Sequence, residues 1–238
     1  MKWNFIALGC LLWLINIPTY AGVVIGGTRV IYPAEQAEVQ VSLKNKDANA
    51  RYLVQSWVSN VADDSKAPFI ITPPIYKLEE ERRTLLHVVY TGDSRSLPQD
   101  RESLFIVNVK SVPAIPSEMR NKNTLQLALK TRIKLFWRPT GLKNNAAKTA
   151  WEKLQFRRQG ERVIVKNPTP FYITFGQFKY GGQEIPAPRA KEIPSALSMM
   201  IAPFSEQAFS LPAAGHGAIT WTAINDYGAE TPSRQQSL

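Results

Sequence analysis

Hydrophobic and polar residues alternate most strictly over residues 123–139, NTLQLALKTRIKLFWRP. From Leu125 to Trp137 every odd position is apolar except Thr131, and the even positions carry bases at 130, 132, 134 and 138. Alternation with a period of two predicts a β-strand that has one apolar face and one basic face. This strand would be about twice as long as the usual 5–6 residues. An apolar face of that length has to be covered by other apolar groups to be shielded from water.

Shorter segments rich in Val, Ile, Leu and aromatic residues fill the rest of the first half, separated by turn clusters such as NKDAN and TGDSRS. They are Val23–Ile25, Glu38–Leu43, Tyr52–Val58, Phe69–Thr72, Arg83–Tyr90 and Ser103–Val109. About seven short strands at this spacing predict an antiparallel β-sandwich.

Residues 140–148, TGLKNNAAK, are polar and turn-rich and predict a linker. Beyond it the strand pattern returns at Leu154–Arg157, Arg162–Val165, Tyr172–Phe178, Ala208–Leu211 and Ala218–Ala223. This half is richer in proline and predicts a second, smaller β domain. We therefore expect an all-β protein with domains over residues 22–141 and 147–238 and little helix.

The first 21 residues carry Lys2, an apolar run from about Phe5 to Ile17, and Ala21 at the end. This order predicts a secretory signal peptide that is cleaved after about Ala21. The run is shorter than the roughly 20 apolar residues of a membrane span, which argues against an anchor. Cys10 is the only cysteine, so the exported protein would contain no disulfide and its domains would depend on their apolar cores.

The formal net charge is +10, and it falls to +9 without Lys2. Such a charge favours acidic partners, an anionic membrane or nucleic acid. Export argues against nucleic acid, and the bases are spread along the chain instead of forming one cluster.

Catalytic and metal-binding patterns are weak. His87 lies in a strand-like run and His216 lies between two glycines, and neither has an Asp, Glu or Cys at ligand spacing. The sequence contains no nucleophile elbow, phosphate-binding loop or dinucleotide fingerprint. We expect no enzyme activity, no metal site and no cofactor.

Six segments carry a family resemblance: GTRVIYP (27–33), ITPP (71–74), LPQDRESLFIVNVKSVP (97–113), RIKLFWRP (132–139), KNPTPFYIT (166–174) and INDYG (224–228). The order and spacing of these six segments are similar to those of the periplasmic pilus chaperones. The chain most closely resembles the type 1 fimbrial group of that family. The resemblance covers essentially the whole chain after residue 21. It implies two immunoglobulin-like domains set at an angle, in a boomerang shape. It also implies a periplasmic protein that binds pilus subunits and delivers them to an outer-membrane usher.

The resemblance implies a role for the long strand as well. A pilus subunit is an incomplete sandwich, and the chaperone inserts its own strand, here residues 123–135, into the open groove. Leu125, Leu127 and Leu129 share one face and would fill that groove. The alternation taken alone favours the other arrangement, in which these leucines pack inside the chain's own sandwich.

Two sets of charged residues are also implied by the resemblance. Arg29 and Lys134 would bind the carboxylate at the subunit's C-terminus. Glu102, Arg138 and Asp226 would form a charge network that holds the angle between the domains. The pattern alone equally allows all of them to be separate surface charges. One departure from the family occurs at Ile106, where an aromatic residue is usual, and there we expect local repacking without loss of the fold.

A secreted two-domain β-sandwich that acts as an adhesin or structural subunit is the alternative function, and a carbohydrate-processing enzyme on a β scaffold is a weaker one. The sequence leaves open which pilus the chain serves. It also leaves open whether the free protein covers its long strand by forming a self-capping dimer.

Overall fold

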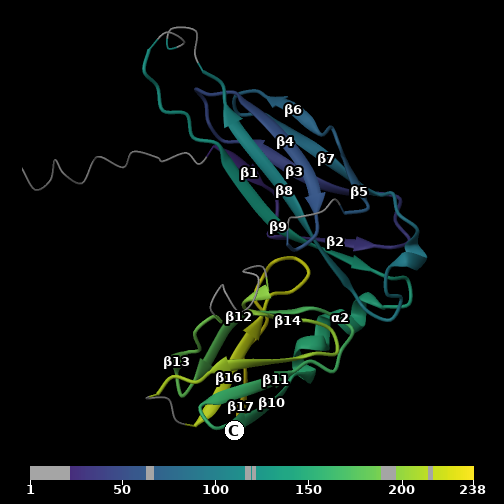
Figure 1. Cartoon of the computed structure of the whole chain (residues 1–238), viewed down its shortest axis with the longest axis vertical. Coiled ribbons are helices and arrows are strands. Elements are labelled where there is room, and N and C mark those ends of the chain that lie inside the picture. Colours follow the sequence, from purple (N-terminus) through teal and green to yellow (C-terminus); the bar gives the residue numbers. More distant parts are fainter. Residues whose placement is uncertain (1–21, 63–66, 116–118, 120–121, 189–196, 214–216) are drawn as a thin grey trace, which may run out of the picture.

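The computed structural model describes residues 22–62, 67–115, 119, 122–188, 197–213 and 217–238. In this part the chain forms two lobes of β-sheet that meet at an angle (Figure 1). The expectation of an all-β protein with two sandwich domains at an angle is confirmed. The expected signal peptide, residues 1–21, and His216 lie outside the described residues.

Two sheets face each other in the first domain. One has the order β1 (Val23–Ile25), β3 (Val39–Asn45), β7 (Arg83–Tyr90) and β5 (Phe69–Thr72). The other has the order β2 (Arg29–Pro33), β9 (Leu129–Arg138), β8 (Ser103–Pro113), β4 (Tyr52–Ser59) and β6 (Ile75–Leu78), and a short 3-10 turn, η2 (Ser94–Ser96), lies before β8. The alternation along the strands turns their apolar residues inward, as the period of two predicted.

The core of this domain lies between the two sheets. Val41 on β3 and Val88 on β7 face the same interior as Leu135 and Trp137 on β9, and all four are almost fully buried. Phe69 packs edge-on against the rings around it, with its centroid 5.0 Å from that of Phe105. The odd positions of the predicted long strand therefore do enter the chain's own core, but only from Ile133 onward.

The long strand is shorter than its alternation predicted, because β9 begins at Leu129 and residues 123–128 pair with no strand in the described part of the chain. The β8–β9 ladder ends with Ser111 opposite Leu129. Continuing this register would place Pro113 opposite Leu127, and a proline has no N–H to donate to the ladder. The side chain of Gln126 contacts the end of β8, with its Nε2 donating to the Pro113 carbonyl at 2.6 Å.

One strand pair departs from the predicted antiparallel arrangement. β2 runs parallel to β9, with Arg29 opposite Lys134 and Pro33 opposite Arg138. The GTRVIYP segment thus adds an edge strand next to the second half of β9, while within the described part of the chain the first half of β9 has a strand on one side alone.

The second domain also packs one sheet on another. The first sheet has the order β10 (Gln155–Gln159), β11 (Arg162–Lys166) and β15 (Glu206–Ser210), and the second has β13 (Gln183–Glu184), β12 (Ile173–Tyr180), β16 (Ala218–Ala223) and β17 (Arg234–Ser237), with β14 (Met200–Ile201) beside β12. Aromatic rings fill its core. Phe175 and Phe178 stack with centroids 4.1 Å apart, and the ring of Phe209 meets Phe178 edge-on.

The expected linker over residues 140–148 was wrong in part, because helix α2 (Asn144–Ala150) occupies most of it and continues into the 3-10 turn η4 (Trp151–Lys153). Ala150 and Trp151 are buried in the second core, and Ala147 packs against it. A segment of seven residues is too short for propensity to indicate a helix, and burial against this core stabilises it instead.

A third apolar cluster joins the domains. Leu104 and Phe136, from β8 and β9, pack with Met200 of the second domain, and the Phe136 ring lies 5.6 Å from that of Tyr172. Phe136 has the even parity of Lys134, so this face of the sheet turns toward the second domain. Ile106 lies on the same face and is 2% exposed, which agrees with a repacked position in an intact fold.

The two ends of the apolar stripe should differ in what they contribute to stability. Leu135→Ala, which empties a fully buried site, should lower the free energy of unfolding by about 2–5 kcal/mol. Leu127→Ala should change it by less than about 0.5 kcal/mol, because this side chain is 66% exposed. Urea denaturation of the free protein measures both values, and equal losses would mean that Leu127 packs inside its own domain in solution.

Candidate functional site

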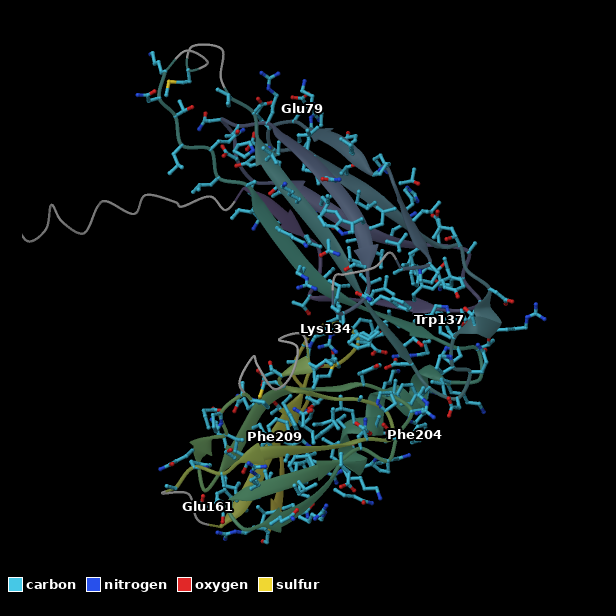
Figure 2. All side chains as sticks on the ribbon, viewed as in Figure 1. Glu79, Lys134, Trp137, Glu161, Phe204 and Phe209 are labelled. Carbon is cyan, nitrogen blue, oxygen red and sulfur yellow. The ribbon has the colours of Figure 1, made fainter. Side chains whose placement is uncertain are left out.

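Two cations lie side by side where β2 begins. Arg29 is the first residue of β2, and the parallel register places it directly opposite Lys134 on β9. Figure 2 shows Lys134 at the junction of the two domains. Two residues more than 100 positions apart in the sequence are therefore brought together by one strand pairing.

Arg29 is held by the second domain. Its Nη1 donates to the Ile224 carbonyl at 2.9 Å, and its guanidinium lies 5.6 Å from the centroid of the Phe136 ring. Burial lowers the pKa of Arg29, while the negative charges of Asp226 and Glu102 act in the opposite direction. Its Nε is buried and has no hydrogen-bond acceptor within the described part of the chain. A buried donor without an acceptor is costly, so this atom indicates that an anion can bind here.

Lys134 is half-buried, and burial together with the nearby charge of Arg29 lowers its pKa to about 8. No Asp or Glu of the described chain forms an ion pair with it. Arg29 and Lys134 are thus two partly desolvated cations without a carboxylate of their own. A carboxylate bound between them would accept charge-assisted hydrogen bonds from both.

The structure also brings together Glu102, Arg138 and Asp226. The guanidinium of Arg138 donates to Glu102 Oε1 at 2.7 Å and 2.9 Å, and to the two oxygens of Asp226 at 2.9 Å and 3.1 Å. Arg138 and Glu102 are almost fully buried, whereas the Asp226 side chain is 33% exposed. Because Asp226 belongs to the second domain, Arg138 connects the two domains.

Glu102 makes a second connection through the backbone. Its Oε2 accepts the N–H of Tyr172 at 2.9 Å, and its own N–H donates to the Pro170 carbonyl at 3.0 Å. Burial raises the pKa of Glu102, and Arg138 and the Tyr172 N–H oppose that rise. Burial lowers the pKa of Arg138, but the hydrogen bonds that it donates to Asp226 and Glu102, together with the charges of these carboxylates, outweigh burial and raise its pKa, so the guanidinium stays charged.

A cleft of about 400 Å³ opens beside these charges. The first domain lines it with Arg29, Ile31 and Phe136, and the second domain lines it with Trp151, Tyr172 and Tyr227 among others. Its wall is mixed, with apolar rings beside the charged groups. Such a cleft suits the end of a polypeptide, which presents a carboxylate next to a side chain.

The leucine stripe precedes Lys134 along the chain. Leu125, Leu127 and Leu129 are 86%, 66% and 61% exposed, so the arrangement in which they pack inside the chain's own sandwich is excluded. The backbone of residues 124–128 forms no backbone hydrogen bond to another described residue. From Leu129 to Ile133, β9 has β8 on one side, and no strand of the described residues pairs with its other edge, which β2 covers from Lys134 onward. A free strand edge of this kind is a template for an added strand.

His87 pairs with a carboxylate outside the junction of the two domains. His87 Nδ1 lies 2.9 Å from Glu38 Oε1 across strands, a neighbour that sequence spacing had not indicated, and both side chains are partly exposed. The part of the chain that the structure describes contains no group of three His, Cys, Asp or Glu residues arranged to hold a metal ion. Within that part, no helix has the length and apolar character needed to cross a membrane.

The second-domain backbone groups in the site could not be found from the sequence. Ile224, Tyr172 and Pro170 contribute a carbonyl, an N–H and a carbonyl, so their side-chain types are not what is used. The nearby motifs INDYG and NPTP were the only signal that these loops matter, and that signal came from the family resemblance.

The fold and the junction define a two-domain β-sandwich protein in which two half-buried cations lie at the end of a strand edge that no described strand covers. The model of the PapD N-terminal domain, described as a pili and flagellar-assembly chaperone, matches residues 22–143. The model of the PapD C-terminal domain, described as a pili assembly chaperone, matches residues 149–235. The chain therefore belongs to the PapD family of pilus-assembly chaperones.

Individual relatives agree with this assignment. The chain is 41% identical to the probable fimbrial chaperone LpfB of Escherichia coli O157:H7, over 96% of this chain and 94% of the relative. It is 40% identical to the chaperone protein FimC of Escherichia coli O6:H1, over 89% of this chain and 83% of the relative. Among solved structures, the Salmonella enterica SafA pilin in complex with the SafB chaperone matches with a TM-score of 0.76 and 32% identity, over 91% of this chain and 96% of that chain.

Members of the charge network should contribute unequally to stability. Glu102→Ala removes a buried carboxylate that binds both Arg138 and a backbone N–H, and it should cost about 3–5 kcal/mol. Asp226→Ala should cost less, about 1–2 kcal/mol, because solvent screens this partly exposed pair. Asp100→Ala breaks the exposed Asp100–Arg101 pair and serves as the control, with no measurable effect expected. Equal effects of all three variants on urea denaturation would contradict a buried network.

Proposed function

We propose that this chain is a periplasmic chaperone that binds, folds and caps pilus subunits by donating a strand, and then delivers them to an outer-membrane usher. One observation carries the proposal. An exposed leucine stripe and an open strand edge end together at two half-buried cations that have no carboxylate partner in the described chain. An incomplete sandwich that ends in a free carboxylate is complementary to all three features.

The leucine stripe supplies the apolar contribution. Leu125, Leu127 and Leu129 have the same parity as Ile133 and Leu135, which are buried in the first core. The same face of one strand thus fills the chain's own core at one end and can fill the subunit's groove at the other. Each leucine that becomes buried would contribute roughly 1.5–3 kcal/mol.

The cation pair would set the direction and register of the added strand. If the subunit's carboxylate lies at Arg29 and Lys134, a strand that extends back from it along the open edge reaches Ile133 first and Leu129 later. This strand runs parallel to β9. Fixing its end fixes which side chains enter the groove, since a slip of one residue would turn every side chain to the wrong face.

The network of Glu102, Arg138 and Asp226 would hold the second domain at the angle that keeps the cleft open. The division into domains at 22–141 and 147–238, export by the signal peptide of residues 1–21, and the absence of enzyme activity belong to the same proposal. The pattern of residues 1–21 supports export, and membership of a chaperone family supports a binding function. The relative that was solved with a pilin supports subunit binding over the alternative of an adhesin.

Removing the anchor should abolish subunit capture without unfolding the protein. A tagged pilus subunit from the same operon, co-expressed with the chain, should co-purify with wild type and not with Lys134→Ala. Lys166→Ala removes an exposed lysine that does not line the cleft and should leave capture unchanged. Circular dichroism checks that both variants fold. Undiminished capture by Lys134→Ala would contradict the anchor assignment, and no capture by wild type would contradict the chaperone function itself.

Capture should also depend on pH through Lys134. Because its pKa in the free protein is about 8, its ammonium is lost as the pH rises through that value, and a carboxylate binds the charged form. Affinity should be full below about pH 7 and should fall by up to about tenfold per pH unit above pH 8. Lys134→Arg keeps its charge and should remove this dependence. Affinities measured by titration that do not change between about pH 7 and 9 in wild type would contradict a role for the Lys134 charge.

The lowered pKa also predicts an effect on stability. A lysine whose folded pKa lies below its unfolded value destabilises the fold while it is charged, and this penalty disappears as the pH rises from about 8 to above 10.5. Lys134→Met should therefore raise the melting temperature of the free protein at pH 7 while abolishing capture. A lower melting temperature would mean that the lysine has a stabilising partner in the free protein.

A further inference from the structure

An exposed tyrosine lies at the wall of the cleft between the domains. Tyr227 is 87% exposed, and it lines the cleft together with Arg29 and Phe136. The anchor uses Arg29 and Lys134, and the charge network uses the neighbouring Asp226, but neither uses the ring of Tyr227. Single exposed apolar side chains are common on protein surfaces, so the position and rigidity of this ring decide whether it has a role.

The turn that carries Tyr227, residues 225–229, is fixed by its own hydrogen bonds. Asn225 Oδ1 accepts the N–H groups of Tyr227 and Ala229, at 2.9 Å and 3.1 Å. The Asn225 carbonyl accepts the N–H of Gly228 at 3.0 Å, and the Asn225 N–H donates to the Ala229 carbonyl at 2.8 Å. Gly228 has a φ of 84°, which a residue with a Cβ rarely adopts. The turn therefore holds one shape.

The same turn is held against the first domain on both sides of the exposed ring. The carbonyl just before the turn accepts a hydrogen bond from Arg29 Nη1 at 2.9 Å. Asp226 accepts two hydrogen bonds from Arg138, at 2.9 Å and 3.1 Å. A Cβ added at Gly228 would lie 2.5 Å from Thr28 Oγ1, so the backbone of the turn packs closely on the residue before Arg29. These contacts fix where the tyrosine stands relative to the cation pair.

A strand added along β9 would bring one of its side chains to this side of the sheet. The face of β9 that carries Lys134 and Phe136 turns toward the second domain, because Phe136 packs with Met200 there. β2 covers the edge of β9 from Lys134 onward, so an added strand ends next to Arg29 and the cleft. Successive side chains of a strand point to opposite faces. Of the last two residues before the bound carboxylate, one therefore has its side chain on the face that turns toward the second domain.

We propose that Tyr227 packs against this side chain and selects subunits that carry an apolar residue at that position. This inference rests on the proposed chaperone function and deepens it by naming a residue that determines which subunit ends are bound. A tyrosine ring covers a large apolar area and has few rotatable bonds to order, and its hydroxyl can stay in water. Because the turn already fixes its backbone, binding costs little further ordering of the chain.

Three synthetic peptides and three variants test the proposal. The peptides copy the last segment of a pilus subunit from the same operon and differ only in their final two residues, which are Phe-Ser, Ser-Phe or Ser-Ser. Tyr227→Ala removes the ring, and Tyr227→Phe keeps it. Tyr76→Ala is the matched control, because Tyr76 is also exposed but lies on β6, at the opposite end of the sheet from β2. Fluorescence anisotropy gives each dissociation constant, and thermal melts check that the variants fold.

Wild type should bind one of the two Phe peptides about 5–20-fold more tightly than the Ser-Ser peptide, and the other Phe peptide should gain much less. Tyr227→Ala should lose this preference, whereas Tyr227→Phe and Tyr76→Ala should keep it. A role of the ring in folding alone would change all three affinities together, so the preference isolates the contact with the peptide.

Several results would overturn the proposal while the chaperone function stands. Wild type could prefer neither Phe peptide or both equally, or Tyr227→Ala could keep the preference or weaken all three peptides by the same factor. In each case the Ser-Ser peptide still binds wild type and loses affinity in Lys134→Ala, which shows that the anchor works without Tyr227. If no peptide binds wild type at all, the proposed anchor fails first and this inference fails with it.

Discussion

The parallel pairing of β2 with β9 is the constraint on which the rest of the site depends. It covers the edge of β9 from Lys134 onward and leaves the preceding residues, from Leu129 to Ile133, with an open edge. It also places Arg29 beside Lys134 at the point where cover begins. A longer β2 would have closed the edge, and an antiparallel β2 would have placed another residue there. The register of this one strand pair thus defines both the open edge of β9 and the two cations, Arg29 and Lys134, at its end.

The interdomain charges explain why the cation pair remains available. Two carboxylates, Glu102 and Asp226, lie near Arg29, but both accept hydrogen bonds from Arg138, which donates four to them. Burial lowers the pKa of Arg29, and their negative charges oppose that lowering, although neither forms an ion pair with it. The network therefore joins the domains, and it also keeps these carboxylates away from Arg29 and Lys134. The free protein keeps two partly buried cations close together, and bound carboxylate would relieve this cost.

Alternation predicted the strands and the shared face of the leucines, because parity depends only on local backbone geometry. It overestimated β9, since pairing depends on the neighbouring strand, and Pro113 ends the ladder near Leu129. It also missed helix α2, which the second core stabilises, and the parallel direction of β2. Periodicity could not bring Arg29 to Lys134 or Arg138 to Asp226, because such contacts depend on tertiary register. Those pairs were indicated only by resemblance to the family, and the backbone groups at Ile224 and Tyr172 were indicated by neither.

Hydrogen exchange at the backbone amides of residues 124–133 tests the central claim most directly. In the free protein, amides in 124–128 should exchange rapidly, because they form no backbone hydrogen bond to another described residue. In a complex with a pilus subunit, protection should appear from Leu125 to Ile133 and should extend continuously to Lys134. Strand addition along β9 predicts this continuous protection. A stable complex in which these amides exchange as fast as in the free protein would contradict the account.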